Sequence, residues 1–473
     1  IDYSGSRRTA YLESLDGKYG FMIETASVED NIFKRYDKVQ ILLYGTALTR
    51  HENPERYVIS GVTAQMITAQ EAGTAVVIPD KKRFVSELTD DDVYTFVTLR
   101  DCEFPVRKGA LTPIHDGYTN AHNNEITSKY PRLMRDIKGS SIYLYTNTTC
   151  PYRRDGRKLP YGSGEISGVV VFELYPGYVY GDGTDEDSHG NIGRYQLRHM
   201  AYEDIRFDDE ASFSALLTEY RYVKDQKQDA SDKRYYWYPT FGSNGRFSHS
   251  TTVKPTTYTT WNYIGPVGTK NALPPFSAHI GNEGYGMGII LEDGTDYNNP
   301  GGKKVDAKIN ADGKGQETSP ACTSWKQTSW WDYANDRGES WCVEFSTADI
   351  ETDFLSMQFT VQGGKAGAGV SPIFWKAEWS LSGDLSGDDG WNYIGSYQVP
   401  DMVISSSVKA WQLGAYKQID IPLPLEMLGH DKVYIRFTPE KNAVNSTTKF
   451  AASEIPAKDA SSAMDYFAIR YNK

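Results

Sequence analysis

The C-terminal half of the chain alternates apolar and polar positions with a period of two. In PIFWKAEWSL, one face would carry Ile373, Trp375, Ala377, Trp379 and Leu381, and the other Phe374, Lys376, Glu378 and Ser380. In KVYIRFTP, Val433, Ile435 and Phe437 oppose Tyr434 and Arg436. One apolar and one polar face per strand is typical of a two-sheet sandwich. Several such segments, separated by Gly, Asp, Ser and Pro, predict a jelly-roll β-sandwich over residues 261–473.

The N-terminal part shows the same period in shorter segments. YGFMIET, KVQILLYGTAL and RYVISGV fall within residues 1–80, and YTFVTLRDCEF, SSIYLYTNT and GEISGVVVFELYPG within 90–210. Gly168 in the last of these is a candidate β-bulge. Two groups of short strands predict two small barrels of the OB kind, which is a five-stranded Greek-key barrel. The predicted fold class is therefore all-β, with two OB-like barrels followed by a jelly-roll β-sandwich.

One segment between these units reads differently. In residues 208–223, Phe213, Leu216, Leu217 and Tyr220 recur at helical spacing after an acidic start. Polar stretches rich in Ser and Thr follow. We therefore predict a helix and a linker over 211–260, with a domain boundary inside the linker.

Two stretches carry a resemblance to known sequences. The first is LPYGSGEISGVVVFE with GRYQLRHMAYEDIRF, and the second runs from WKAEWSLSGDLSGDDGWNYIGSYQVPD to SSAMDYFAIRYNK. They resemble uncharacterised surface lipoproteins of the Bacteroidetes, in which tandem OB-like domains precede a C-terminal jelly roll of the galactose-binding or concanavalin-like kind. The resemblance implies export to the outer membrane surface or the periplasm. It supplies no catalytic or binding residues.

The start of the sequence departs from that group. It has no lipobox cysteine and no initiator Met, and we expect that the start was trimmed. Membrane attachment would then depend on a lipid anchor that is absent from this fragment.

Charge and motifs exclude several kinds of function. The net charge is −12, so we expect no nucleic-acid partner. The sequence lacks a G-x-S-x-G elbow, an HExxH motif, a P-loop and a Rossmann glycine pattern after a strand. A glycoside hydrolase needs two carboxylates across a cleft, which the sequence alone cannot pair. We therefore expect no catalytic residues and no cofactor, and keep a glycoside hydrolase as the third alternative.

Metal and cysteine chemistry give weak signals. The acidic stretch GDGTDEDSHGN places Asp182, Asp185 and Asp187 where a structural Ca²⁺ would find oxygen ligands, but it lacks the EF-hand frame. A solvated hairpin loop explains it better. The chain has four cysteines and no CxxC, so we expect no zinc site. One or two disulfides or four buried thiols remain open.

The strongest candidate site is a tryptophan-rich segment. The stretch TSPACTSWKQTSWWDYANDRGESW contains Trp325, Trp330, Trp331 and Trp341. Sugars stack their CH-rich faces on exposed aromatic rings, while nearby polar side chains bond the hydroxyls. The alternative is that these rings pack over the end of a sheet. Cys322 and Cys342 bracket the segment, so a disulfide there would pin the loop.

The short sequence WNYIG occurs at 261–265 and again at 391–395. The flanking residues do not match, so we interpret the pair as coincidence and not as an internal repeat. In the second copy, the alternation places Trp391, Tyr393, Tyr397 and Val399 on one face and Ile394 on the other.

These patterns favour a non-enzymatic, exported cell-surface protein. Its C-terminal jelly roll would bind a glycan or another surface component, and the two barrels would act as spacers or docking units. The alternative hypothesis is a structural or adhesive module that binds a protein partner without binding sugar. Fold alone does not decide between them.

Overall fold

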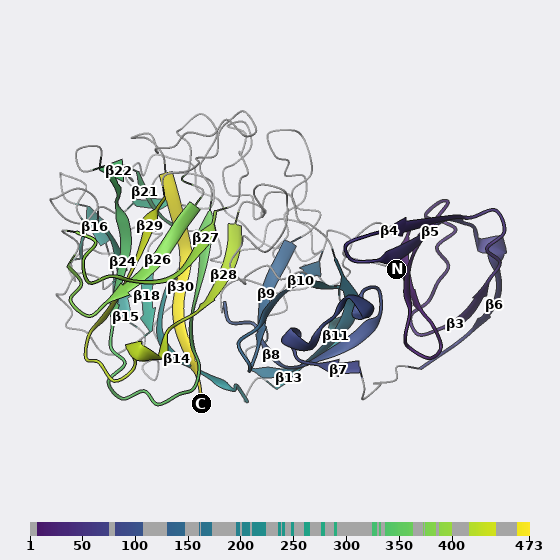
Figure 1. Cartoon of the computed structure of the whole chain (residues 1–473), viewed down its shortest axis with the longest axis horizontal. Helices are drawn as coiled ribbons and strands as arrows, with labels where there is room; N and C mark the ends of the chain where they lie inside the picture. Colours follow the sequence, from purple (N-terminus) through teal and green to yellow (C-terminus); the bar gives the residue numbers. More distant parts are fainter. Residues whose placement is uncertain are drawn as a thin grey trace.

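The protein is an all-β chain in the computed structural model shown in Figure 1. Three units follow one another along the longest axis. The structure describes residues 7–74, 81–106, 130–146, 160, 162–172, 195–198, 201–208, 211–223, 235–237, 239–241, 247–249, 260–264, 276–279, 288–290, 324–328, 331–332, 336–362, 372, 374–384, 387–399, 416–440 and 461–473. Within those ranges the helical elements are short 3-10 turns, and no helix is long and apolar enough to cross a membrane.

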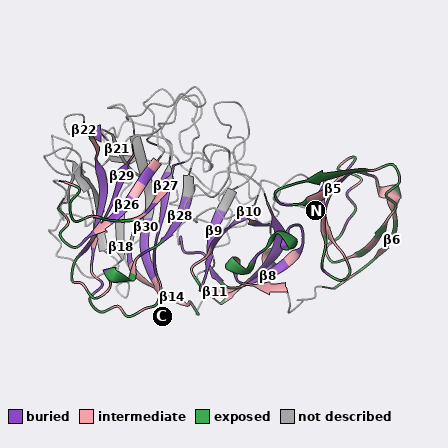
Figure 2. Cartoon of the chain, in the orientation of Figure 1, coloured by how far each residue is buried: buried purple, intermediate pink, exposed green. Residues whose placement is uncertain are grey.

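The first unit is a four-stranded sheet with a two-stranded ribbon packed against it. Its strands are β1 (Thr9–Glu13), β2 (Gly20–Thr25), β5 (Arg56–Val62) and β4 (Ala47–His51) in sheet order, with β3 (Lys38–Ile41) and β6 (Ile67–Glu71) forming the ribbon. The pair β2–β5 is parallel. The core is small and is formed by Ala10, Ile23, Phe33, Ile59 and Val62. Figure 2 shows most of this unit as exposed or intermediate.

The second unit contains a closed five-stranded barrel. Its strands pair in the ring order β8 (Phe96–Glu103), β9 (Tyr130–Asp136), β10 (Ser141–Thr146), β12 (Gln196–Arg198), β11 (Ser163–Val171) and back to β8. If the five strands are numbered 1 to 5 along the chain, from β8 to β12, their order around the ring is 1-2-3-5-4. The third and fifth strands, β10 and β12, are parallel. The OB-like barrel predicted for this part of the chain is confirmed.

The barrel interior follows the predicted alternation. Ile142 and Leu144 lie in the core with Val97, Leu99 and Leu197. The short strands β7 (Lys82–Arg83) and β13 (Ile205–Asp208) flank the ring. Short 3-10 turns lie at Val85–Glu87, Asp90–Asp92 and Tyr202–Asp204.

The bulge predicted at Gly168 is wrong, because the extra residue lies on the partner strand β8, where Arg100 and Asp101 oppose Glu165 alone. The register shift between β11 and β8 falls between Gly164 and Ile166. Gly168 has a different role, because a Cβ atom there would lie 2.6 Å from the carbonyl oxygen of Arg198. A side chain at this position would block the close approach of β12.

The third unit is a β-sandwich. One sheet contains β15 (Tyr235–Trp237), β18 (Thr260–Ile264), β14 (Ser214–Val223), β30 (Ser461–Asn472), β21 (Ser324–Thr328), β20 (Gly288–Ile290), β25 (Leu355–Gln362) and β28 (Tyr416–Pro422). The other contains β19 (Phe276–His279), β24 (Ser340–Phe345), β29 (Val433–Pro439), β26 (Phe374–Ser380) and β27 (Asn392–Gln398). Two short ribbons are β16 (Pro239–Phe241) with β17 (Phe247–His249) and β22 (Trp331–Asp332) with β23 (Arg337–Gly338), and a 3-10 turn spans Leu425–Met427.

The two sheets enclose one apolar core. Val433, Ile435 and Phe437 of β29 have no exposed surface, as their alternation predicts. The Phe359 ring of β25 lies 5.1 Å from the Phe437 ring and joins the two sheets. Figure 2 shows β29 as mostly buried.

The helix predicted over 208–223 is wrong. Residues 214–223 form β14, which pairs with β18 on one side and β30 on the other. Helical spacing of Leu216, Leu217 and Tyr220 is a local signal, and pairing on both sides overrides it. A bulge between Leu216 and Thr218 also breaks the alternation that would have indicated a strand.

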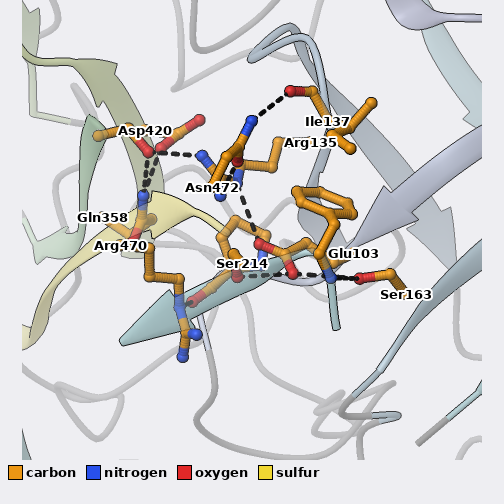
Figure 3. A network of polar contacts seen from close by, with 12 residues as sticks. Glu103, Arg135, Ile137, Ser163, Ser214, Gln358, Asp420, Arg470 and Asn472 are labelled. Atoms are coloured by element: carbon orange, nitrogen blue, oxygen red, sulfur yellow. Dashed lines mark hydrogen bonds and ion pairs between the residues drawn. The ribbon is translucent and has the colours of Figure 1, made fainter. Parts of the chain in front are cut away.

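A buried polar network joins the barrel to the sandwich (Figure 3). Arg135 of β9 is fully buried and bonds Glu103 of β8 at 3.1 Å and Ser356 of β25 at 2.7 Å. Asp420 of β28 accepts hydrogen bonds from Ser141 of β10 at 2.8 Å and from Gln358 of β25 at 2.7 Å. Because buried charges require partners, these contacts fix how the barrel and the sandwich meet.

Candidate functional site on the outer face of the sandwich

A row of cross-strand neighbours lies on the face of the smaller sandwich sheet that is turned away from the core. In register across β24, β29, β26 and β27, the row contains Cys342, Arg436, Glu378 and Tyr393. Residues paired in this way share one face of a sheet. Lys376 lies two positions before Glu378, so it shares that face, and its Nζ lies 2.8 Å from the Glu378 carboxylate.

Arg436 organises this face. Its Nε donates to Glu378 at 2.8 Å, and its two terminal nitrogens donate to the Gly387 carbonyl at 3.0 Å and to the Asp388 carboxylate at 2.7 Å. The Trp391 ring lies over the guanidinium, with 4.4 Å between Cζ and the ring centroid. A planar guanidinium bonds several acceptors and stacks on a ring at once, so Arg436 holds the 387–391 turn on the sheet.

Trp391 and Tyr393 are the aromatic residues of this surface. Trp391 is half-buried against Arg436, and its Nε1 donates to the Asp384 carbonyl at 2.7 Å. Tyr393 is 58% exposed, and its hydroxyl is 2.8 Å from the Ser396 hydroxyl. The two rings therefore present aromatic surface beside polar groups.

The predicted common face of Trp391, Tyr393, Tyr397 and Val399 is wrong. Tyr397 and Val399 are buried in the sandwich core, whereas Tyr393 is exposed. The cause is a register shift between β26 and β27 in which Ala377 pairs with Gly395 but Glu378 pairs with Tyr393. One extra residue turns every earlier side chain of the strand to the opposite face.

The pKa values of two groups on this face, the Asp388 carboxyl and the Cys342 thiol, are shifted in opposite directions. Burial acts to raise the pKa of Asp388, but the hydrogen bond and positive charge of Arg436 outweigh it and lower that pKa. Burial raises the pKa of the Cys342 thiol to about 12. Cys342 is a free, buried thiol in this structure, and its burial disfavours the thiolate form.

The tryptophan-rich segment is placed only in part. Trp341 of β24 has no exposed surface and packs in the sandwich core, and Trp331 of β22 is 7% exposed. Trp325 lies on β21, and Trp330 lies outside the described residues. The segment starts at one sheet and ends in the other, because β21 and β24 belong to different sheets.

The other candidates from the sequence are the acidic stretch GDGTDEDSHGN and the first WNYIG copy. Asp182, Asp185 and Asp187 fall outside the described residues. Among the residues that are described, no group of three or more His, Cys, Asp or Glu side chains is placed to hold a metal ion. The first WNYIG copy lies on β18 and runs through a different sheet from the second copy on β27.

Periodicity alone misses Tyr393, because it directs that ring into the core. The useful signal was the turn SGDLSGDDG before Trp391, which places Gly and Asp residues beside an aromatic strand start. Together, Trp391, the exposed Tyr393 and the carboxylate of Asp388 place aromatic surface beside a hydrogen-bond acceptor on this face.

Comparison with known proteins gives distant fold neighbours. No family model and no curated protein matches the chain. Among solved structures, it is similar to the K1 cleaved adhesin domain of Lys-gingipain from Porphyromonas gingivalis, with 10% identity over 43% of this chain and 94% of that chain and a TM-score of 0.22. It is also similar to a xylan-binding carbohydrate-binding module from Paenibacillus barcinonensis. The identity is 11% over 44% of this chain and 90% of that chain, and the TM-score is 0.21.

A third neighbour is a carbohydrate-binding module from Caldicellulosiruptor saccharolyticus solved with mannohexaose. It shares 12% identity over 32% of this chain and 74% of that chain, with a TM-score of 0.18. These three neighbours are one adhesin domain and two carbohydrate-binding modules. Their identities and TM-scores are too low to transfer a function to this chain.

Proposed function

We propose that this chain is a non-enzymatic, exported surface protein that binds a glycan through its C-terminal sandwich. The observation that carries the proposal is the exposed Tyr393 ring beside Trp391, which Arg436 holds in place. A sugar ring would stack on these two side chains. The Asp388 carboxylate, whose side chain is 71% exposed, would accept hydrogen bonds from sugar hydroxyls.

The geometry of the site supports binding more than catalysis. The Glu378 side chain is 11% exposed and is bonded by both Lys376 and Arg436. A carboxylate held by two cations at the base of the site would orient the turn and the rings. Trp330 of the tryptophan-rich segment remains a proposed additional contact, as does Trp325.

A glycan array followed by calorimetry tests the proposal. We expect at least one glycan class to bind, and Tyr393→Ala to weaken its affinity about tenfold, which corresponds to about 1.4 kcal/mol. The control is Tyr44→Ala, because Tyr44 is also a solvent-facing tyrosine, 88% exposed, but lies in the first unit. The proposal fails if no glycan binds or if the two substitutions have the same effect.

A second candidate function is adhesion to a protein partner. The first unit exposes Leu42 at 56%, Tyr44 at 88% and Leu48 at 64%, and exposed apolar clusters mark contact surfaces. Crosslinking to envelope proteins that is lost with Tyr44→Glu and kept with Tyr393→Ala would favour adhesion. The opposite pattern would favour the sandwich surface.

A further inference from the structure

A large cleft lies between the first unit and the barrel. Its volume is about 980 Å³, at the upper end of the roughly 300–1,000 Å³ typical of ligand pockets. The first unit supplies β1, the 14–17 turn and residues 33–43, and the barrel supplies Tyr94, Phe96 and Val169. None of the residues that line the cleft belongs to the strands of the sandwich, so it is a separate site.

Specific contacts hold the two walls together. Tyr36 from the first unit meets Phe96 of the barrel edge to face, with 6.0 Å between ring centroids, and Tyr11 lies 5.6 Å from Tyr94. Arg35 pairs with Asp204 of the barrel unit. A cleft whose walls are fixed before binding loses less conformational entropy when a ligand enters.

The walls of this cleft are largely apolar. Phe21, Phe33, Tyr94 and Phe96 supply rings, and Leu15 and Leu43 supply aliphatic side chains. Leu15 is 89% exposed and Leu43 is 51% exposed. Covering these two side chains would remove apolar surface from water, so an apolar ligand body would be stabilised here.

The charge of the lining has the opposite sign to that of the whole chain. Lys34, Arg35, Lys38 and Lys81 line the cleft with only two anions, Glu13 and Asp37. Lys81 pairs with Glu13 at 3.1 Å, and Asp37 accepts a hydrogen bond from Gln70. Within the described part of the chain, the exposed Lys34 and Lys38 make no ion pair, so they attract an anionic group in a protein of net charge −12.

We propose that this cleft binds an amphipathic anion, which is a small molecule with an apolar body and one acidic group. The body packs on Phe96, Leu15 and Leu43, and the acidic group faces Lys34 and Lys38. An acyl chain and an aromatic ring system share this chemistry, and the experiment below separates them.

The test is a titration with the anionic dye anilinonaphthalene sulfonate, displaced by laurate in one arm and by 2-naphthoate in the other. We expect saturable binding of one dye per chain and displacement by laurate or naphthoate. Their neutral alcohols, dodecanol and naphthalene methanol, should bind about tenfold more weakly, because the lysines contribute nothing to them. The arm with the stronger competitor identifies the class of apolar body.

Adjacent leucines provide a matched control. Leu43 lines the cleft and Leu42 does not, although both are exposed. Leu43→Glu should reduce dye affinity at least about tenfold, since it places a carboxylate where the apolar body packs, and Leu42→Glu should leave it unchanged. Lys34→Glu with Lys38→Glu should weaken acid binding and spare the alcohols.

Three outcomes would overturn the proposal. They are equal effects of Leu42→Glu and Leu43→Glu, equal affinity for an acid and its alcohol, or the absence of saturable binding by a folded chain. Circular dichroism of each variant excludes dye binding to unfolded protein. Glycan binding by the sandwich should be unchanged by Leu43→Glu, so this proposal and the proposed function fail independently.

Discussion

Arg436 shows how one side chain can determine a surface. It is 4% exposed, and its nitrogens bond Glu378, Asp388 and the Gly387 carbonyl while Trp391 covers its plane. Alternation within KVYIRFTP indicates that this residue points away from the core. It does not indicate that a turn from another part of the chain covers the residue, because that contact is between distant segments.

The substitution Arg436→Lys should therefore be costly. An ammonium group cannot bond all three acceptors and stack on Trp391, so we expect the free energy of unfolding to fall by roughly 2 kcal/mol. The control is Arg50→Lys, because Arg50 is 54% exposed and, among the described residues, pairs with the surface side chains of Glu52 and Glu55, so its change should stay below about 0.5 kcal/mol. Urea unfolding of both variants measures the difference. Equal losses would contradict the role given to Arg436.

At the scale of single elements, regular alternation is predictable and irregular register is not. Val433, Ile435 and Phe437 point inward as expected, and Ile142 and Leu144 do the same in the barrel. The bulges in β14 and β27 each add one residue, and nothing in the local sequence marks them. The fold class could thus be predicted, whereas the exposure of Tyr393 could not, because one extra residue in a strand decides it.

Two substitutions of Thr218 test whether residues 214–223 form a strand or a helix. Thr218 of β14 is 1% exposed, and its hydroxyl has no hydrogen-bond partner among the residues described. Thr218→Val keeps the shape and removes a buried polar group, so it should stabilise the fold by about 1 kcal/mol. Thr218→Ala leaves a cavity and should destabilise it by about 1 kcal/mol.

An exposed helix would respond differently to the same two changes. Ala is the best helix former, and Thr and Val have similar helix propensities, so Ala would stabilise and Val would be neutral. Thermal unfolding of the two variants decides between these patterns. Stabilisation by Ala with no effect of Val would contradict a strand here.

At the scale of the whole molecule, two interfaces of different character join the three units. The barrel meets the sandwich through buried polar groups around Arg135 and Asp420. The first unit meets the barrel mainly through rings, such as Tyr11 against Tyr94 and Tyr36 against Phe96. Neither interface is visible in the sequence, since each brings together strands far apart along the chain.

Asp420 gives the polar interface a pH dependence. Burial raises the pKa of Asp420 above its ordinary value of 3.8, against the charge of Arg135 and the hydrogen bond from Gln358, which lower it. At pH values between 3.8 and the raised pKa of the folded state, Asp420 holds more protons in the folded state than in the unfolded state. The contribution of Asp420 to the free energy of unfolding is therefore largest below pH 3.8. It is lost as the pH rises through the pKa of the folded state.

The substitution Asp420→Asn removes this titration. The free energy of unfolding of the variant, relative to the natural chain, should increase as pH rises from about 4 to 7. Urea unfolding of both chains at several pH values measures the difference between their free energies of unfolding. Other titrating groups, including Asp136, contribute equally to both chains and drop out of this difference. A difference that does not change with pH, or that decreases, would contradict the raised pKa.

Gly20 keeps the first unit on the barrel. A Cβ atom at this position would lie 2.4 Å from the carbonyl carbon of Tyr94, where nothing can yield without moving backbone. Gly20→Ala should destabilise this contact by roughly 1–3 kcal/mol and lower dye affinity for the cleft. At Gly395 the nearest atom to such a Cβ is 3.6 Å away, so Gly395→Ala is the control.

Small-angle scattering reads out this change directly. The Gly20→Ala chain should show a larger radius of gyration than the natural chain, while Gly395→Ala should not. Identical scattering curves for all three chains would show that the first unit is held in another way.

We propose above all that the outer face of the sandwich binds a glycan by ring stacking. Calorimetry on Tyr393→Phe and Tyr393→Ala with the best glycan from the array tests it most directly. Stacking requires the ring and not the hydroxyl, so Tyr393→Phe should keep affinity within about threefold and Tyr393→Ala should lose about tenfold. Equal affinity of all three chains, or equal loss in both variants, would contradict it.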